Sequence, residues 1–250
     1  MLARCLVLVC GVALAAVPCV GQGVTEDLSK GVSFKFKIAP SLPEFTFKII
    51  PNIAAPDERG NAESTVQEVE VYRGDGKQPV QHLTDCTPTD EPPRKGFDWF
   101  RAQDLNFDGY ADIYMLTSWG ATGNQYGCVW LYNPASGRFD FSKEFSELPR
   151  FWLDTASKTI FTFDRGGMVG QVHDASQYKV EGNRPVVIMH EHQDWDFDRK
   201  QFHCVVEERK GAVMATTKDE WSKPGDDWSK AEAPCDASEL FGKYVNGTGR

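Results

Sequence analysis

The chain has 250 residues and a formal net charge of −9, with 36 acidic side chains against 27 lysines and arginines. This acidic balance, with no basic stripe in the sequence, argues against a nucleic-acid partner, because phosphate binding depends on clustered cations. It permits a cationic protein partner, since opposite charge speeds encounter, although plain solubility explains the same charge.

The N-terminus has the pattern of a secretory signal peptide, which we predict to span residues 1–22. Arg4 precedes an uncharged apolar run from Cys5 to Val20, a charged segment followed by an apolar one. A membrane span needs about 20 apolar residues, and no later run approaches that length. The sequence therefore predicts a periplasmic or secreted protein without a membrane span. Removal of Arg4, the only charged side chain of this segment, takes the net charge from −9 to −10.

Four cysteines follow the predicted signal peptide. They are Cys86, Cys128, Cys204 and Cys235. An even number in an exported protein favours two disulfides, and three pairings are possible. The alternative is four buried free thiols.

Most of the chain has the alternating pattern of half-buried strands. Alternation is clearest at residues 32–38, 45–50 and 65–72, and GDGK at 74–77 has the glycines of a hairpin turn. Further strands are predicted at residues 113–117, 128–132, 159–164, 177–180, 185–192 and 202–208, and one helical turn at residues 145–148. Short strands separated by turns predict an all-β, antiparallel fold, a propeller-like or sandwich-like array of hairpins.

The segment DLNFDGYAD, residues 104–112, has the spacing of an EF-hand-like calcium loop without flanking helices. Asp104, Asn106 and Asp108 alternate, Gly109 allows a sharp turn, and Tyr110 and Asp112 follow. Calcium takes six to eight oxygen ligands, and such loops supply them at alternating positions. We predict that Ca²⁺ binds here in a structural role; the alternative is a solvated turn rich in Asp and Asn. The predicted ligands are Asp104, Asn106, Asp108, Tyr110 and Asp112.

A second acidic run, DWDFD at residues 194–198, lacks the glycine of the first. We predict a solvated strand edge or hairpin at this position. With the proline-rich stretch at residues 87–95 as a boundary, the chain divides into four parts. These are the signal peptide (1–22), N-terminal β strands and a proline-rich loop (23–95), a calcium-loop β domain (96–217) and an irregular polar tail (218–250).

From Gln103 onward the order of features resembles a known family. QDLNFDGYADIYML precedes a Gly/Asn-rich loop, SWGATGNQYG, followed by CVWLYNPASGRF, DRGG and YKVEGNRPVVI. This order is similar to that of bacterial periplasmic calcium-loop β proteins, a family that includes a xanthomonad immunity protein against a type IV secreted, lysozyme-like peptidoglycan hydrolase. The resemblance covers residues 65–190 approximately. It implies a propeller-like fold, calcium at the five loop residues and inhibition of a hydrolase, but it identifies no inhibitory residue.

Residues 118–127 are the first candidate for a loop that enters a hydrolase cleft. A lysozyme-like cleft holds paired carboxylates, and an inserted loop should offer hydrogen-bond donors and an aromatic anchor. Trp119, Asn124 and Tyr126 meet this requirement, and Arg165 of DRGG is a second candidate. Calcium bound just upstream would pre-organise this loop. The alternative is that Trp119 and Tyr126 pack between sheets and the loop is a connector.

Two other functions compete with inhibition. One is a calcium-stabilised extracellular adhesion or interaction module without inhibitory activity. The other is an enzyme, but the sequence has no G-x-S-x-G elbow, H-E-x-x-H helix or phosphate loop. We therefore predict a binding protein, with a cationic peptidoglycan hydrolase or another protein as its partner.

Overall fold

A computed structural model describes residues 26–235, except residues 56, 57, 59–62, 88, 90, 94, 121 and 226. The predicted signal peptide and residues 236–250 of the predicted tail lie outside the described residues. Within the described part, fourteen strands form three antiparallel sheets, accompanied by one short α-helix. The predicted all-β, antiparallel fold class is confirmed.

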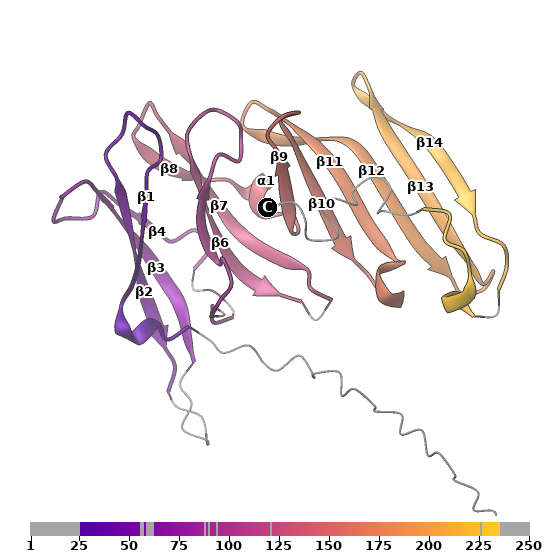
Figure 1. Cartoon of the computed structure of the whole chain (residues 1–250), viewed down its shortest axis with the longest axis horizontal. Helices are drawn as coiled ribbons and strands as arrows, with labels where there is room; N and C mark the ends of the chain where they lie inside the picture. The colour runs from indigo at the N-terminus through magenta and orange to yellow at the C-terminus, as the bar shows by residue number, and fades with distance from the viewer. Residues whose placement is uncertain are drawn as a thin grey trace, which may run out of the picture.

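The three sheets follow one another along the chain and lie in that order in space (Figure 1). Sheet 1 contains β1 (Val32–Phe36), β2 (Phe45–Ile53), β3 (Ser64–Arg73) and β4 (Gln81–Leu83). Sheet 2 contains β5 (Phe100–Gln103), β6 (Asp112–Trp119), β7 (Gln125–Asn133) and β8 (Arg138–Phe141), followed by α1 (Lys143–Ser146). Sheet 3 contains β9 (Phe151–Asp154), β10 (Thr159–Arg165), β11 (His173–Glu181), β12 (Arg184–Asp196), β13 (Gln201–Lys210) and β14 (Val213–Trp221). Neighbours in every sheet are consecutive in sequence, so each sheet is a run of hairpins.

Sheet 1 has one buried face, as its alternating sequence predicts. Phe45, Phe47 and Ile49 of β2 are buried, whereas Lys48 between them is exposed. The buried face packs on sheet 2, where the rings of Phe47 and Phe139 meet edge to face with centroids 5.4 Å apart. Burial of such aromatic side chains supplies most of the stabilisation of this interface.

Sheet 2 lies between the other two sheets and is buried on both faces. Ile113 and Met115 of β6 belong to the core shared with sheet 1. Tyr114, between them, belongs to a second core shared with sheet 3, where its ring meets Phe151 edge to face at 5.5 Å. Burial on two faces explains why β6 and β7 have nearly continuous apolar runs instead of alternation.

Sheet 3 extends past the region that covers sheet 2, and β12, β13 and β14 form its far end (Figure 1). Strand β14 runs to Trp221, so the first residues of the segment predicted to be irregular, 218–221, belong to a strand. These residues pair with β13, where His203 is opposite Trp221 and Val206 is opposite Lys218. Backbone pairing with β13 therefore extends the strand although the local sequence is polar.

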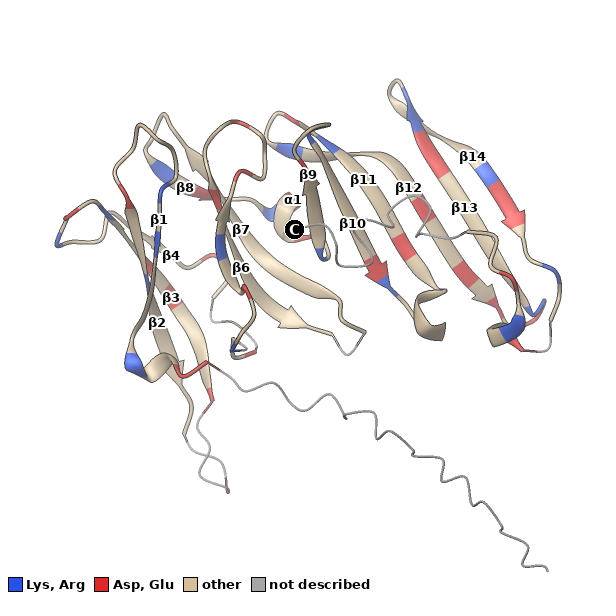
Figure 2. Cartoon of the chain, viewed as in Figure 1, with Lys and Arg blue, Asp and Glu red and all other residues tan. Residues whose placement is uncertain are grey.

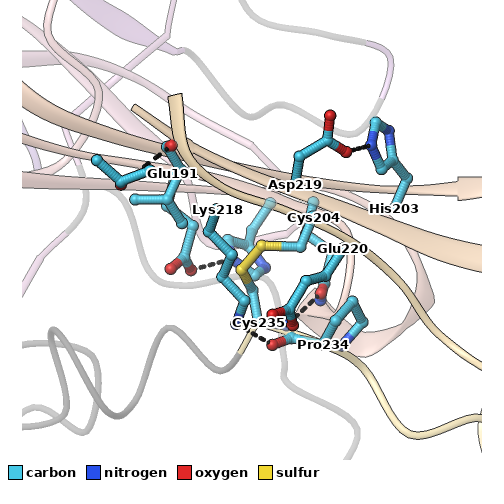
Figure 3. The surroundings of a disulfide bond; sticks show 12 residues. Glu191, His203, Cys204, Lys218, Asp219, Glu220, Pro234 and Cys235 are labelled. Atoms are coloured by element: carbon cyan, nitrogen blue, oxygen red, sulfur yellow. Dashed lines mark hydrogen bonds and ion pairs between the residues drawn. A yellow bond between two sulfur atoms is a disulfide. The ribbon is translucent and has the colours of Figure 1, made fainter. Parts of the chain in front are cut away.

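Both predicted disulfides form, and the structure selects one of the three pairings. Cys86 is bonded to Cys128 and Cys204 to Cys235, with Cα–Cα distances of 6.1 and 5.8 Å, within the range that disulfides require. The first bond joins the segment after β4 to β7, and so connects sheets 1 and 2. The second fastens the chain after β14 to β13 (Figure 3). The Cys235 N–H also donates a hydrogen bond to Gln193 Oε1 of β12 at 2.8 Å.

Two local predictions are also confirmed. The second acidic run ends β12 and turns into a hairpin, in which Asp196 Oδ1 accepts hydrogen bonds from the N–H groups of Asp198 and Arg199. The predicted helical turn is α1, two residues earlier than expected, with Ser142 as its N-cap. Phe145 of this turn is buried against sheets 2 and 3.

Gly127 of β7 is the position where the packing of sheet 2 leaves no room for a side chain. A Cβ atom there would lie 2.5 Å from the Tyr114 ring and 2.6 Å from the Met115 carbonyl oxygen. We expect Gly127→Ala to lower the free energy of unfolding by about 3 kcal/mol, the upper range for overpacking. Urea denaturation measures the loss, with Gly167→Ala as the control, because a Cβ at Gly167 meets nothing within 4 Å. Equal stability of the two variants would contradict this account.

Candidate functional site

The loop between β5 and β6 folds around the side chain of Asp104. Its Oδ1 accepts a hydrogen bond from the N–H of Asp108 at 3.0 Å, and its Oδ2 accepts one from the N–H of Gly109 at 2.9 Å. The backbone reaches this geometry through positive φ angles, 61° at Phe107 and 92° at Gly109. Glycine adopts such an angle without steric cost, so Gly109 supplies the sharp turn.

Asn106 and Asp108 bring further side-chain oxygens into the same loop. Asn106 Oδ1 accepts from the Asp108 N–H at 3.2 Å, and Asp108 Oδ1 accepts from the Tyr110 N–H at 2.9 Å. The Tyr110 ring packs on Tyr132 of β7, with centroids 5.4 Å apart. The loop therefore brings together two carboxylates and one side-chain amide. This set of oxygens fits Ca²⁺, a hard cation that takes oxygen ligands.

The loop also connects sheet 2 to sheet 3. Asn106 Nδ2 donates a hydrogen bond to Oδ1 of Asn183 at 3.2 Å, and Asn183 lies in the turn between β11 and β12. Asn106 is buried, so water does not compete strongly for this bond. Any ligand that orders Asn106 would therefore also strengthen the contact between the two sheets.

Asp112, the fifth predicted calcium ligand, is fully buried. Its Oδ2 accepts from the Leu105 N–H and its Oδ1 from the Tyr132 N–H, both at 2.8 Å. Burial raises the pKa of Asp112 to about 7, and the negative charges of Asp108 and Asp104 contribute to this rise. The two backbone hydrogen bonds act in the opposite direction and lower the pKa. Asp112 thus ties the start of the loop to β7, and its role as a calcium ligand stays a prediction.

The loop and the turn that follows β6 lie at opposite ends of that strand. The loop ends at Asp112 and the turn begins after Trp119. A strand rises about 3.3 Å per residue, which places the two ends of β6 about 23 Å apart. An ion in the loop would therefore act on the β6–β7 turn only through the strand.

The structure brings three of the four predicted partner-binding residues together at the end of β10. Asn124 Oδ1 accepts from the Arg165 N–H at 2.9 Å, while its Nδ2 donates to the Arg165 carbonyl oxygen at 3.0 Å and to the Asp164 carboxylate. Tyr126 OH donates to Asp164 Oδ2 at 2.8 Å. Burial, together with this hydrogen bond, raises the pKa of Tyr126 to about 12. The β6–β7 turn is thus fastened to β10, at the same edge of the molecule in Figure 1.

Trp119, the fourth predicted partner-binding residue, is partly buried at the end of β6. Its ring meets the ring of Phe97 edge to face, with centroids 4.6 Å apart. Phe97 precedes β5 and is exposed. These two residues place an aromatic pair at this end of sheet 2.

Sequence reasoning missed a carboxylate–imidazole group on sheet 1. Among the described residues, the ligand atoms of Glu68, Glu70 and His82 lie within 4.8 Å of one another. Alternation puts the two glutamates on one face of β3, but only the pairing of β3 with β4 places His82 beside them. Glu70 Oε2 already accepts from Lys48 Nζ at 3.0 Å and from Tyr72 OH at 2.7 Å. Because Lys48 supplies the positive charge, this group does not call for a metal ion.

The connection between Tyr126 and Asp164 should contribute to stability. We expect Tyr126→Phe to lower the free energy of unfolding by about 2 kcal/mol, because it removes a hydrogen bond to a charged group. Tyr178→Phe is a matched control, since Tyr178 packs against the core of sheets 2 and 3 through its ring. Chemical denaturation of both variants measures the difference. A loss for Tyr178→Phe as large as that for Tyr126→Phe would argue against the contribution of this hydrogen bond.

The helices in the described part of the chain are not long and apolar enough to cross a membrane. No protein-family model matches the chain, and no curated protein matches it in sequence. A solved structure of a Xanthomonas type IV secretion system related protein is similar to it, with a TM-score of 0.50 and 16% sequence identity. The match covers 78% of this chain and 98% of that one. At this low identity the likeness shows a shared fold.

Proposed function

We propose that this protein is an exported, calcium-binding β protein that inhibits a lysozyme-like peptidoglycan hydrolase, as an immunity protein does. The observation that carries the proposal is the oxygen-lined loop of residues 104–112, set in a fold similar to that of a type IV secretion system related protein. The two disulfides are consistent with an extracytoplasmic location, because such bonds persist in oxidising compartments.

Calcium in this proposal has a structural role. The side chains of Asp104, Asn106 and Asp108 and the carbonyl of Tyr110 would bind it, with Asp112 as the last member of the predicted set. The ion would neutralise neighbouring carboxylates and hold Asn106 against Asn183. This stabilises the contact between sheets 2 and 3, which also positions the β6–β7 turn beside β10.

The partner in this proposal is a cationic hydrolase. Acidic positions lie on β12, β13 and β14 in the far part of sheet 3, with basic positions among them on β13 and β14 (Figure 2), and the whole chain has a net charge of −9. Opposite charge would speed the encounter. A segment at the edge formed by the β6–β7 turn and the end of β10 would then enter the active-site cleft, where paired carboxylates of the hydrolase lie.

The second candidate is a calcium-stabilised adhesion or interaction module. The observation that favours it is the internal use of the β6–β7 turn. Asn124 and Tyr126 are bonded to Arg165 and Asp164, and such side chains are less available for a partner. A module of this kind would bind cells, glycans or proteins without affecting a hydrolase.

Loss of the two loop carboxylates should abolish stabilisation by calcium. At about 100 times its dissociation constant, a ligand that binds only the folded state adds about 2.7 kcal/mol, which corresponds to roughly 8 °C in Tm for a protein of this size. We expect this shift for the wild type and none for Asp104→Ala combined with Asp108→Ala, measured by calorimetry in calcium and in EGTA. Asp194→Ala combined with Asp198→Ala, with the same spacing in the second acidic run, is the control and should keep the shift. A shift retained by the first pair would exclude this loop as the calcium site.

Inhibition can be measured directly by the clearing of peptidoglycan suspensions. The purified protein is added, with calcium or EGTA, to lysozyme-type hydrolases, beginning with any encoded beside its gene. We expect clearing to slow in proportion to the amount of protein, and the effect to weaken in EGTA at temperatures where the protein loses stability. Full clearing by every hydrolase in the presence of folded, calcium-loaded protein would favour the interaction module instead.

A further inference from the structure

Arg150 lies directly before β9 at the edge of sheet 3 and is partly buried. Its guanidinium stacks on the ring of Trp152, 4.8 Å from the centroid. Arg199 makes a similar stack on Trp221 at 4.3 Å, but it also forms an ion pair with Asp196 at 3.8 Å. Within the described residues, Arg150 has no ion pair of this kind. Its charge is therefore stacked on an aromatic ring without being neutralised.

A small cavity lies beside this guanidinium. Its volume is about 80 Å³, and its walls come from two sheets. The lining residues are Arg150, Trp152, Phe163 and Arg165 from sheet 3 and Thr122, Gly123 and Asn124 from the β6–β7 turn. The space suits one small polar group rather than a whole sugar or peptide.

The opposite wall is held in place by hydrogen bonds between the Asn124 side chain and the Arg165 backbone. Asn124 binds both the N–H and the carbonyl of Arg165. The Arg165 side chain lies over Gly170, where an added Cβ would come within 3.0 Å of Nε. The pocket therefore contains two arginines, Arg150 and Arg165. The neighbouring carboxylate of Asp164 forms its hydrogen bonds with Asn124 and Tyr126.

A third arginine adds to the positive charge. Arg101 of β5 stacks on Tyr114 at 4.2 Å, and its buried Nε has no hydrogen-bond partner. Burial lowers the pKa of Arg150, and the positive charges of Arg165 and Arg101 lower it further. Such repulsion in a partly desolvated site would be relieved by an anion, and planar guanidinium groups match a carboxylate in two-pronged hydrogen bonds.

The segment next to the pocket has the features of a protein contact. Met168, Val169 and Gly170 all have positive φ angles, 53°, 58° and 87°, and Val169 is 88% exposed. A β-branched residue rarely adopts this conformation, and strain of this kind is concentrated at binding sites. The Arg165 side chain, which lines the pocket, lies against Gly170, so the exposed Val169 is one residue along the chain from that contact.

We propose that the pocket between Arg150 and Arg165 receives one carboxylate side chain of a protein partner, with Val169 as the neighbouring apolar contact. The inference rests on the proposed function, in which that carboxylate belongs to the active-site cleft of the hydrolase. The main contact with the partner would then be made by Arg150 and Arg165, and the β6–β7 turn would hold these side chains in place.

The pocket can be tested without a hydrolase. Sodium acetate is titrated at constant ionic strength while the Arg Nε–H and Trp indole N–H signals are followed by NMR, with acetamide as the neutral isostere. We expect saturable shifts of the Arg150 and Trp152 signals with acetate only, lost in Arg150→Gln and in Arg165→Gln. Arg199→Gln, which removes the paired Arg–Trp stack, should leave the shifts unchanged. Equal responses to acetate and acetamide, or loss of the shifts in Arg199→Gln alone, would overturn the proposal.

The second arm uses the clearing assay. Arg150→Gln should weaken inhibition at least about tenfold, since loss of one partner of a buried charge pair costs more than 1.4 kcal/mol. A hydrolase whose active-site glutamate is replaced by glutamine should bind the wild type and Arg150→Gln equally well, because it has no carboxylate for Arg150 to bind. Inhibition by Arg150→Gln equal to that of the wild type would overturn this inference while the proposed function stands. Acetate binding in the pocket without inhibition of any hydrolase would overturn the proposed function and the hydrolase as the source of the carboxylate.

Discussion

Burial of sheet 2 on both faces is the constraint on which the rest of the structure depends. Ile113 and Met115 pack toward sheet 1, and Tyr114 packs toward sheet 3. Strand β6 therefore cannot shift without disturbing two cores, and it carries the oxygen-lined loop at one end and the β6–β7 turn at the other. Hydrogen bonds to sheet 3 hold each end, through Asn106 at the loop and through Asn124 at the turn. The two candidate sites are thus parts of one rigid frame.

Although the chain has a net negative charge, three of its arginines lie close together between sheets 2 and 3. Strands β13 and β14 carry exposed or half-buried acidic side chains (Figure 2), interspersed with Arg209, Lys210 and Lys218. Arg101, Arg150 and Arg165 instead gather where sheets 2 and 3 meet, beside aromatic rings. A charge near apolar groups interacts more strongly than one in water. An acidic protein can therefore attract a cationic partner over a long range and still bind an acidic side chain of that partner at close range.

Calcium and a partner would act on this frame at separate places. The loop of residues 104–112 uses local N–H groups to orient its own carboxylates, and Asp112 ties it to β7. An ion there would add stability to the contact of sheets 2 and 3 without touching a partner at the other end of β6. In the proposed function, stabilisation by calcium and recognition of a partner would therefore be separable properties, linked by the rigidity of one strand.

The sequence by itself determined the features that depend on near neighbours. Alternation at residues 45–50 specified a strand with one buried face. Gly109 among alternating oxygens specified a tight turn, because the hydrogen bonds of that turn to Asp104 lie within nine residues. Tertiary structure decided the rest. The choice of Cys86–Cys128 among three pairings, the burial of Asp112, and the meeting of Arg150 with Arg165 and Asn124 depend on which sheets face each other. The packing of side chains from strands far apart in the chain sets that arrangement, so it cannot be predicted from a local sequence pattern.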